Sequence, residues 1–147
     1  MLFVLNKKND INMIKKIIPV LFAAALVMSL VSCKNTKQKL QEYVVTYNKS
    51  TAKSFHEENI TLTTARGYLE DNKIELRFET NLKETESNKL AAVSSFPILL
   101  KKMLKEDKIP QELIEEGVRF DTYFLADDNT VLAKEVINKE ALPNLLK

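Results

Sequence analysis

Apolar and polar residues alternate along four short segments of the chain, which is the pattern of β-strands with one buried face. The contrast is sharpest over residues 74–79, and residues 118–125 alternate in the same sense. Residues 60–65 precede the first run and residues 131–137 follow the second, each across a turn rich in aspartate and asparagine. These two residue types favour turns because their side chains hydrogen-bond to nearby backbone groups. The pattern predicts two β-hairpins.

Apolar residues at helical spacing precede each hairpin. The first helical stripe consists of Leu40, Tyr43, Val44 and Tyr47. It predicts about three helical turns that end at residues 48–51. Residues 90–104 predict a second helix, in which Pro97 marks a kink or a new start, since an interior proline costs about 3 kcal/mol. We expect its buried side to hold Val93, Phe96, Leu100, Met103 and Leu104.

The order of elements is α-β-β-α-β-β, which predicts a single α+β domain over residues 40–147. Two short helical segments are expected as well, at residues 111–116 before a glycine and at residues 138–142 before a proline. Hairpins favour antiparallel pairing, so we expect a four-stranded, mainly antiparallel sheet with helices packed on one face. Phe78 and Phe120 are expected in its core.

The N-terminal part of the chain has a different pattern. Lys15 and Lys16 precede residues 17–31, which form an uncharged and mostly apolar run. A basic segment followed by such a run is typical of a signal peptide, whereas a membrane-spanning helix needs about 20 apolar residues. The run ends in Leu30-Val31-Ser32-Cys33, which resembles the lipobox of bacterial lipoprotein precursors.

This resemblance implies cleavage between Ser32 and Cys33 and lipidation of Cys33. Residues 1–32 would then be a lipoprotein signal peptide and residues 33–39 a short tether. The implied location is the bacterial cell envelope, at the outer membrane or the periplasmic face, with membrane lipid as a partner through the acylated cysteine. The alternative is an uncleaved N-terminal anchor helix. Met13 stands just before the basic pair and is an alternative start.

Charge and cysteine content restrict the functions of the mature chain. The full sequence has a net charge of +2, but removal of residues 1–32 takes away four lysines and one aspartate and leaves about −1. This balance gives no support for nucleic-acid binding. Cys33 is the one cysteine in the sequence, so a lipidated chain keeps no thiol for a disulfide, a metal site or catalysis.

Candidate catalytic or metal-binding residues are few. His56 is the single histidine and stands beside Glu57 and Glu58. It is a candidate metal ligand or general base, but without a second imidazole or a thiol a surface-loop position is the expected one. Residues 127–129, Asp-Asp-Asn, offer oxygen ligands for calcium, yet they lead directly into a strand and are expected to form a turn. The sequence therefore predicts no catalytic residue, metal or cofactor.

Two surfaces could contact partners. The lysines of the second helix could meet anionic lipid head groups, although a solvated helix face is the expected role. Tyr68, Tyr123 and Leu125 could form an apolar cluster on the open side of the sheet, and such a cluster marks a partner surface. We therefore expect a non-catalytic binding or accessory module of the envelope with a protein partner. The alternative is an immunity or inhibitor protein that acts on a membrane-proximal toxin or enzyme.

Overall fold

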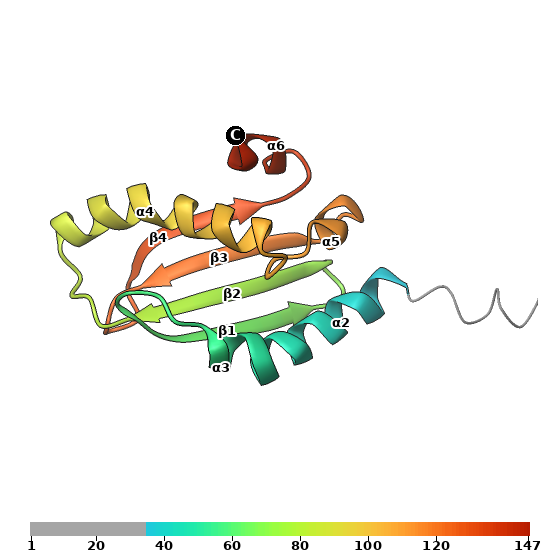
Figure 1. Cartoon of the computed structure of the whole chain (residues 1–147), viewed down its shortest axis with the longest axis horizontal. Coiled ribbons are helices and arrows are strands. Elements are labelled where there is room, and N and C mark those ends of the chain that lie inside the picture. The colour runs from blue at the N-terminus through green and yellow to red at the C-terminus, as the bar shows by residue number, and fades with distance from the viewer. Residues whose placement is uncertain (1–34) are drawn as a thin grey trace, which may run out of the picture. The chain divides into compact units, whose positions relative to one another are not determined.

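Four strands form one mixed sheet, and the domain belongs to the α+β class as predicted (Figure 1). The strands are β1 (Ile60–Tyr68), β2 (Lys73–Thr80), β3 (Arg119–Leu125) and β4 (Val131–Ile137), in the order β1-β2-β3-β4. The structure is a computed structural model and describes residues 35–147. The predicted signal peptide, the lipidation of Cys33 and the alternative start at Met13 lie outside the described residues.

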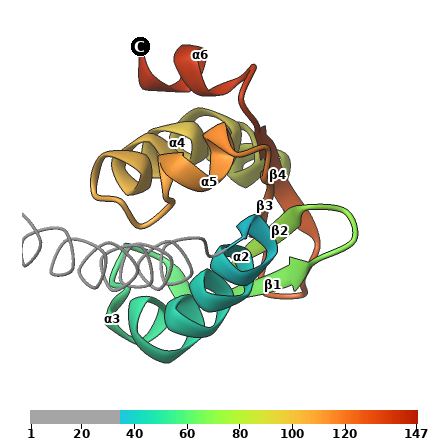
Figure 2. The ribbon, with the colours of Figure 1, turned by 90° about the vertical axis from the view of Figure 1, so that its right-hand side faces the viewer.

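Both predicted hairpins are present, and the pairing between them is parallel. Strands β1 and β2 are antiparallel, and so are β3 and β4. Strand β2 lies parallel to β3, because the chain returns across the sheet through helices α4 (Glu86–Lys105) and α5 (Gln111–Glu115). Figure 2 shows these two helices and α2 (Thr36–Thr46) on the same side of the sheet. No helix of residues 35–147 lies on the opposite face of the sheet.

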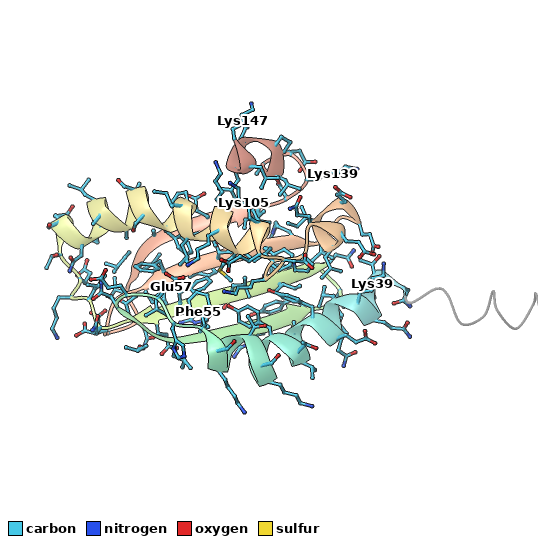
Figure 3. All side chains as sticks on the ribbon, in the orientation of Figure 1. Lys39, Phe55, Glu57, Lys105, Lys139 and Lys147 are labelled. Atoms are coloured by element: carbon cyan, nitrogen blue, oxygen red, sulfur yellow. The ribbon has the colours of Figure 1, made fainter. Side chains whose placement is uncertain are left out.

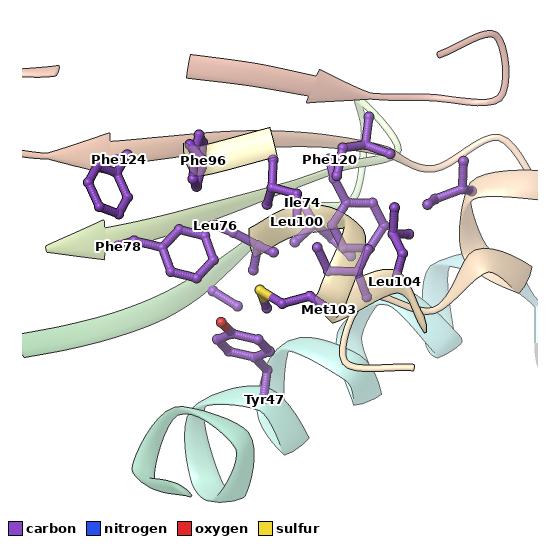
Figure 4. Packing of buried hydrophobic residues seen from close by; sticks show 14 of the residues in the cluster. Tyr47, Ile74, Leu76, Phe78, Phe96, Leu100, Met103, Leu104, Phe120 and Phe124 are labelled. Carbon is purple, nitrogen blue, oxygen red and sulfur yellow. The ribbon is translucent and has the colours of Figure 1, made fainter. Parts of the chain in front are cut away.

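The hydrophobic core lies between this helical layer and the sheet. Phe78 and Phe120 are fully buried, as predicted. Phe96 of α4 packs between Phe78 and Phe124, with ring centroids 5.6 and 5.3 Å from theirs (Figure 4). Aromatic pairs at such separations favour tilted and edge-to-face arrangements, so these rings fix how α4 sits on the sheet.

The first helix begins earlier than predicted. Asn35 is its N-cap, and its side chain accepts a hydrogen bond from the backbone of Gln38, whose own side chain accepts one from the backbone of Asn35. This reciprocal capping box satisfies backbone donors at the start of a helix. Lys39, in the first turn, is held by Glu112 and Glu116. The prediction of a tether over residues 33–39 is therefore wrong for its last four residues, which are helical.

The first helix also ends later than predicted. A π-helical turn, η1 (Tyr47–Thr51), leads into α3 (Ala52–Ser54). The Tyr47 hydroxyl lies 2.7 Å from that of Thr63, and the Asn48 side chain makes two 2.8 Å hydrogen bonds to the backbone of Ala65. The two Asn48 bonds occupy backbone groups on the free edge of β1, where an unpaired strand would be open to another chain. The π turn therefore serves tertiary contacts that the helical pattern does not encode.

Strand β1 buries the face that holds Thr63 and Ala65, whereas Leu62 is 48% exposed. The reason is an irregularity in the pairing between Ile60 and Leu62, which changes which residues point inward. Gly67 is exposed, but it lies on the same face of the strand as Ala65, and a Cβ atom there would come within 2.8 Å of Leu40. Glycine at this position lets α2 approach the strand closely.

Helix α4 is longer than predicted and continuous. The Thr85 side chain caps its start, and the helix passes Pro97 without a new beginning. Val93 was expected in the core but is 59% exposed, and the adjacent Ala92 is buried instead. At about 100° per residue, Ala92 lies on the same side as Phe96 and Val93 lies at its margin.

Turn positions agree better with the sequence. Asn72 and Asn129 have positive φ angles of 45° and 68° in the two hairpin turns, a conformation that asparagine tolerates. Gly117 follows α5 with φ of 94°, as predicted. The expectation at the C-terminus is wrong: Asn138 caps a turn, but Pro143 lies in the first turn of helix α6 (Leu142–Leu146) and does not end it.

Candidate functional site

The open face of the sheet does not carry the apolar cluster predicted from Tyr68, Tyr123 and Leu125. Leu125 is only 1% exposed, because an irregularity in the pairing between Phe124 and Leu125 breaks the alternation and leaves both residues buried. The tyrosines are half-buried, and the pairing register places them on β1 and β3 with β2 between them. The prediction for Leu125 is therefore wrong.

Charged side chains occupy the space that the cluster would need. The Lys73 ammonium lies 4.1 Å from the centre of the Tyr68 ring, and that of Lys134 lies 5.0 Å from the Tyr123 ring. Such cation–π contacts leave each tyrosine covered on one side by a lysine. Arg119 makes an ion pair with the nearly buried Asp121, with a 2.9 Å contact. This face is a mixed-charge surface, typical of the solvated side of a sheet.

The candidate metal ligands do not converge. His56 is exposed, and its neighbour Glu57 accepts a 2.5 Å hydrogen bond from Lys102. Asp128 accepts a bond from the backbone of Thr130, which lowers the pKa of the Asp128 carboxyl and closes the predicted turn. In residues 35–147, no group of three or more histidine, cysteine, aspartate or glutamate side chains is arranged to hold a metal ion.

The lysines of α4 divide into paired and unpaired groups. The hydrogen bond to Glu57 raises the pKa of Lys102, which thus stays charged. Lys108, just beyond the helix, makes a 2.7 Å ion pair with Glu106. Within the described part of the chain, Lys101 and Lys105 make no ion pair. The predicted lysine group is therefore not one continuous positive patch.

A groove lies beside α4 in the part of the chain that the structure describes. It has a volume of about 500 Å³ and lies between one side of α4, the segment before β1 and the segment after β2. We call it the α4 groove, and its apolar lining consists of Ile60, Leu82, Ala91, Ala92, Phe96, Ile98, Leu99 and Phe124. This volume falls in the range of about 300–1,000 Å³ that is usual for ligand pockets.

The rim of the α4 groove is polar. It is formed by Glu57, Glu58, Asn59, Asn88, Ser95 and Lys102. Two carboxylates and one ammonium give the rim an excess of one negative charge at neutral pH. Because Lys102 is already bound to Glu57, the charge left over belongs to Glu58, which is exposed. The arrangement fits an apolar group inside the groove and a polar or basic group at its edge.

The solvent side of α4 next to the groove is also apolar. Leu90 and Ile98 are each 70% exposed, and Val93 is 59% exposed. No residue from 90 to 100 carries a charge, so one whole side of three helical turns meets solvent without a charged side chain. The sequence shows this signal as a long uncharged interval in a helix that is otherwise rich in lysine. Helical periodicity places Val93, Phe96 and Leu100 of this interval on the buried side, and it does not predict how far Leu90 and Ile98 are exposed.

Comparisons with known proteins give no further assignment. No family model matches the chain, and no curated protein or solved structure matches it. Among the helices of residues 35–147, none has the length and apolarity needed to cross a membrane. The lipobox resemblance and the surface features described above are the observations that bear on its function.

Proposed function

We propose that the protein is a lipid-anchored binding module of the bacterial cell envelope, without catalysis, that holds an apolar side chain of a protein partner in the α4 groove. The observation that carries this proposal is the groove itself, an apolar hollow with a polar rim beside an uncharged helix surface. Exposed apolar surface of this kind commonly marks an interaction site. A protein partner is favoured because aliphatic and aromatic anchors in pockets dominate binding at protein interfaces.

The start of α2 supports an anchor that holds the domain close to the membrane. Only Lys34 separates Cys33 from the N-cap Asn35, and two Cα–Cα steps span about 7 Å at most. The first turn of α2 carries Lys39, which Figure 3 labels. This turn is fixed to α5, since Lys39 contacts Glu112 at 2.6 Å and Glu116 at 2.5 Å. A lipid on Cys33 would therefore confine the groove to a thin layer above the bilayer, where modest affinity yields high occupancy.

The anchor is tested by labelling. The full chain should fractionate with membranes and incorporate a fatty-acid analogue, and Cys33→Ser should abolish the label because the acceptor sulfur is gone. The mature N-terminus, read by mass spectrometry, should be residue 33. Label that persists in Cys33→Ser, or an N-terminus at another residue, overturns the lipoprotein assignment.

The groove is tested by filling it. Ser95 lies on its rim and is exposed, so Ser95→Trp should occupy the groove without disturbing the core. The matched control is Ser50→Trp, an exposed serine on η1 outside the groove lining. We expect a partner protein that is recovered from membranes in stoichiometric amount with the wild type and the control, but not with Ser95→Trp. Equal recovery with all three chains would place the partner site elsewhere.

A catalytic role is tested at His56. This side chain is exposed, and in residues 35–147 it does not belong to a group of side chains that could hold a metal ion. His56→Ala should therefore leave the cellular phenotype unchanged. Loss of activity in His56→Ala, together with a stoichiometric metal in the purified chain, would replace the binding module with an enzyme.

A further inference from the structure

The two edges of the sheet differ in how their outward backbone groups are bonded. On the β1 edge, the Asn48 side chain bonds to both the amide and the carbonyl of Ala65. On the β4 edge, no hydrogen bond within residues 35–147 reaches the backbone of residues 131–137 from outside the sheet. An open strand edge binds another strand most readily, because an extended backbone matches its row of donors and acceptors.

The outward groups of β4 can be assigned to particular residues. The Thr122 hydroxyl of β3 donates a 2.9 Å hydrogen bond to the carbonyl of Glu135, so the backbone of Glu135 faces β3. Along an antiparallel strand, successive residues direct their amide and carbonyl to opposite sides. The backbone groups of Lys134 and Val136 therefore face away from the sheet, where nothing in residues 35–147 pairs with them.

Helix α4 lies over this edge strand. Figure 2 shows α4 at the β4 edge of the sheet and α2 at the β1 edge, and β4 is the strand closest to α4. A helix with its side chains is about 10–12 Å across, whereas neighbouring strands are about 4.8 Å apart. A part of α4 about as wide as one strand therefore extends beyond β4.

The overhanging side of α4 is apolar and exposed. The α4 groove lies on the side of the helix toward β1, because Ile60 and the segment before it line the groove. At about 100° per residue, Leu90 and Val93 lie on the other side of the helix from the groove residue Ser95. Val93 lies about 60° around the helix from the buried Phe96, yet it is 59% exposed. Its exposure follows from where the sheet ends, and one more strand would cover it.

We propose that the β4 edge and the overhanging side of α4 form a binding site for an extended segment of a partner protein, which adds a fifth strand to the sheet. The backbone of the segment pairs with Lys134 and Val136, and every second side chain lies beneath Val93 and Leu90. These side chains are therefore apolar. On the open face, an acidic side chain suits Lys134, which makes no ion pair within residues 35–147. Backbone pairing supplies affinity and alternate side chains supply specificity in such complexes.

The sequence of β4 disfavours a second copy of this chain as the added strand. Antiparallel pairing of all seven residues about a twofold axis sets Lys134 opposite its own copy, and a shift to the next register does the same for Glu135. Like charges directly opposite each other destabilise a strand pair. A shift the other way centres on Ala133 and meets the irregular pairing beside Leu132. A different chain is therefore the better partner.

Peptides selected from a displayed library of random decapeptides provide the probe. The library is panned on the full chain with Cys33→Ser, here called the parent chain, which lacks the lipid acceptor. The enriched peptides should alternate apolar and polar residues. When one of them binds, exchange of the Lys134 and Val136 amide hydrogens, followed by NMR, should slow by about tenfold or more. The amide of Glu135 faces β3 and is protected already, so its exchange should change little.

Two substitutions in the parent chain test the two parts of the site. Val136→Pro removes the outward amide donor while the bonds to β3 remain, and it should lower affinity for the selected peptide about tenfold. Its matched control is Val136→Thr, which keeps the donor and a β-branched side chain and should bind as the parent chain does. Val93→Glu places a charge over the added strand and should also lower affinity about tenfold. Its control is Val45→Glu on α2, at a residue with 46% exposure, which should leave binding unchanged.

Three outcomes would overturn the added strand. A library that yields no peptide with higher affinity for the parent chain than for Val93→Glu would remove the site. Selected peptides that bind Val136→Pro and Val93→Glu as tightly as the parent chain, but not Ser95→Trp, would belong to the α4 groove. A parent chain that dimerises on sedimentation, and is monomeric with Val136→Pro, would assign the edge to a second copy.

Circular dichroism and urea unfolding check that each variant folds. Should Val136→Pro unfold the sheet, Val93→Glu and the exchange pattern still decide. The β4 edge is separate from the α4 groove, and its use goes beyond the proposed function and does not depend on lipidation of Cys33. Labelling at Cys33 and partner loss with Ser95→Trp do not involve β4, so failure of the fifth strand is distinguishable from failure of the proposed function.

Discussion

Over residues 90–100, both sides of α4 are uncharged in sequence, yet their environments are opposite. On the core side, Phe96 and Leu100 are 1% and 0% exposed, whereas on the outward side Leu90 and Ile98 are 70% exposed. A helix that is hydrophobic all round is expected to be buried all round. In residues 35–147 nothing covers the outward side to that extent, so apolar composition by itself does not decide which side of a helix is buried.

The largest difference in unfolding free energy between the two sides is expected when an aromatic core residue is replaced by alanine. Phe96→Ala removes the ring that lies between Phe78 and Phe124 and should cost about 3–5 kcal/mol of unfolding free energy. Ile98→Ala, two residues away on the outward side, should change it by no more than about 0.5 kcal/mol. Urea unfolding followed by circular dichroism measures both. Similar costs at the two positions would show that the outward side of α4 is covered in the folded protein.

A smaller effect is expected at the proline between the two sides. Pro97 cannot donate a backbone hydrogen bond, so the carbonyl of Val93 has no helical partner. Pro97→Ala restores that donor and should stabilise the domain by about 1–3 kcal/mol in the same urea assay. Ser94→Ala is the control for a general gain in helix propensity, worth about 0.5 kcal/mol. A loss of stability in Pro97→Ala would mean that the ring makes packing contacts that outweigh the missing bond.

Tyr47 lies near Met103 of α4 in the core (Figure 4). Its hydrogen bond to Thr63 should contribute about 1 kcal/mol to the free energy of unfolding, and its phenol should make that free energy depend on pH. Burial raises the pKa of Tyr47 to about 12 from a usual 10.0, and it raises the pKa of Tyr43 as well. A raised pKa means that the neutral phenol is favoured in the folded state. The stability it contributes is complete below pH 10 and is lost as the pH rises through about 12.

Tyr47→Phe tests this link between burial and ionisation. It should lose the hydrogen bond to Thr63 at neutral pH and should make the fall in stability from pH 10 to 12 shallower. Thr63→Val removes the same bond but keeps the buried phenol, so its alkaline fall should remain. Chemical unfolding at a series of pH values measures both variants. An unchanged alkaline profile in Tyr47→Phe would contradict the assignment of this transition to the buried phenol.

The smallest effect is expected at His56, beyond the rim of the α4 groove. The side chain is exposed, so His56→Ala should alter unfolding free energy by less than about 0.5 kcal/mol. The neighbouring Phe55 is only 8% exposed and provides a contrast, since Phe55→Ala should destabilise the domain measurably. A large cost at His56 would indicate contacts with the groove that its exposure does not suggest.

The local sequence pattern predicts secondary structure correctly where one face of an element is exposed to solvent and the other is buried. Strand β2 buries Ile74, Leu76 and Phe78 as its alternation predicts, and the asparagine turns have the expected backbone. The errors lie where tertiary contacts override the pattern. The π turn at Tyr47–Thr51 forms because Asn48 bonds to the edge of β1, and Leu125 is buried because the strand pairing is irregular beside it.

The sequence by itself determined the α+β class, the two hairpins and the core aromatics, because these depend on periodicity and on turn chemistry within a few residues. It also carries the lipobox resemblance, which depends on order along the chain alone. Only the tertiary structure decided the parallel pairing of β2 with β3, the α4 groove and the exposure of the outward side of α4. These features depend on contacts between segments that are distant in sequence. Whether one side of a helix is buried depends on what packs against it and not on its own residues alone.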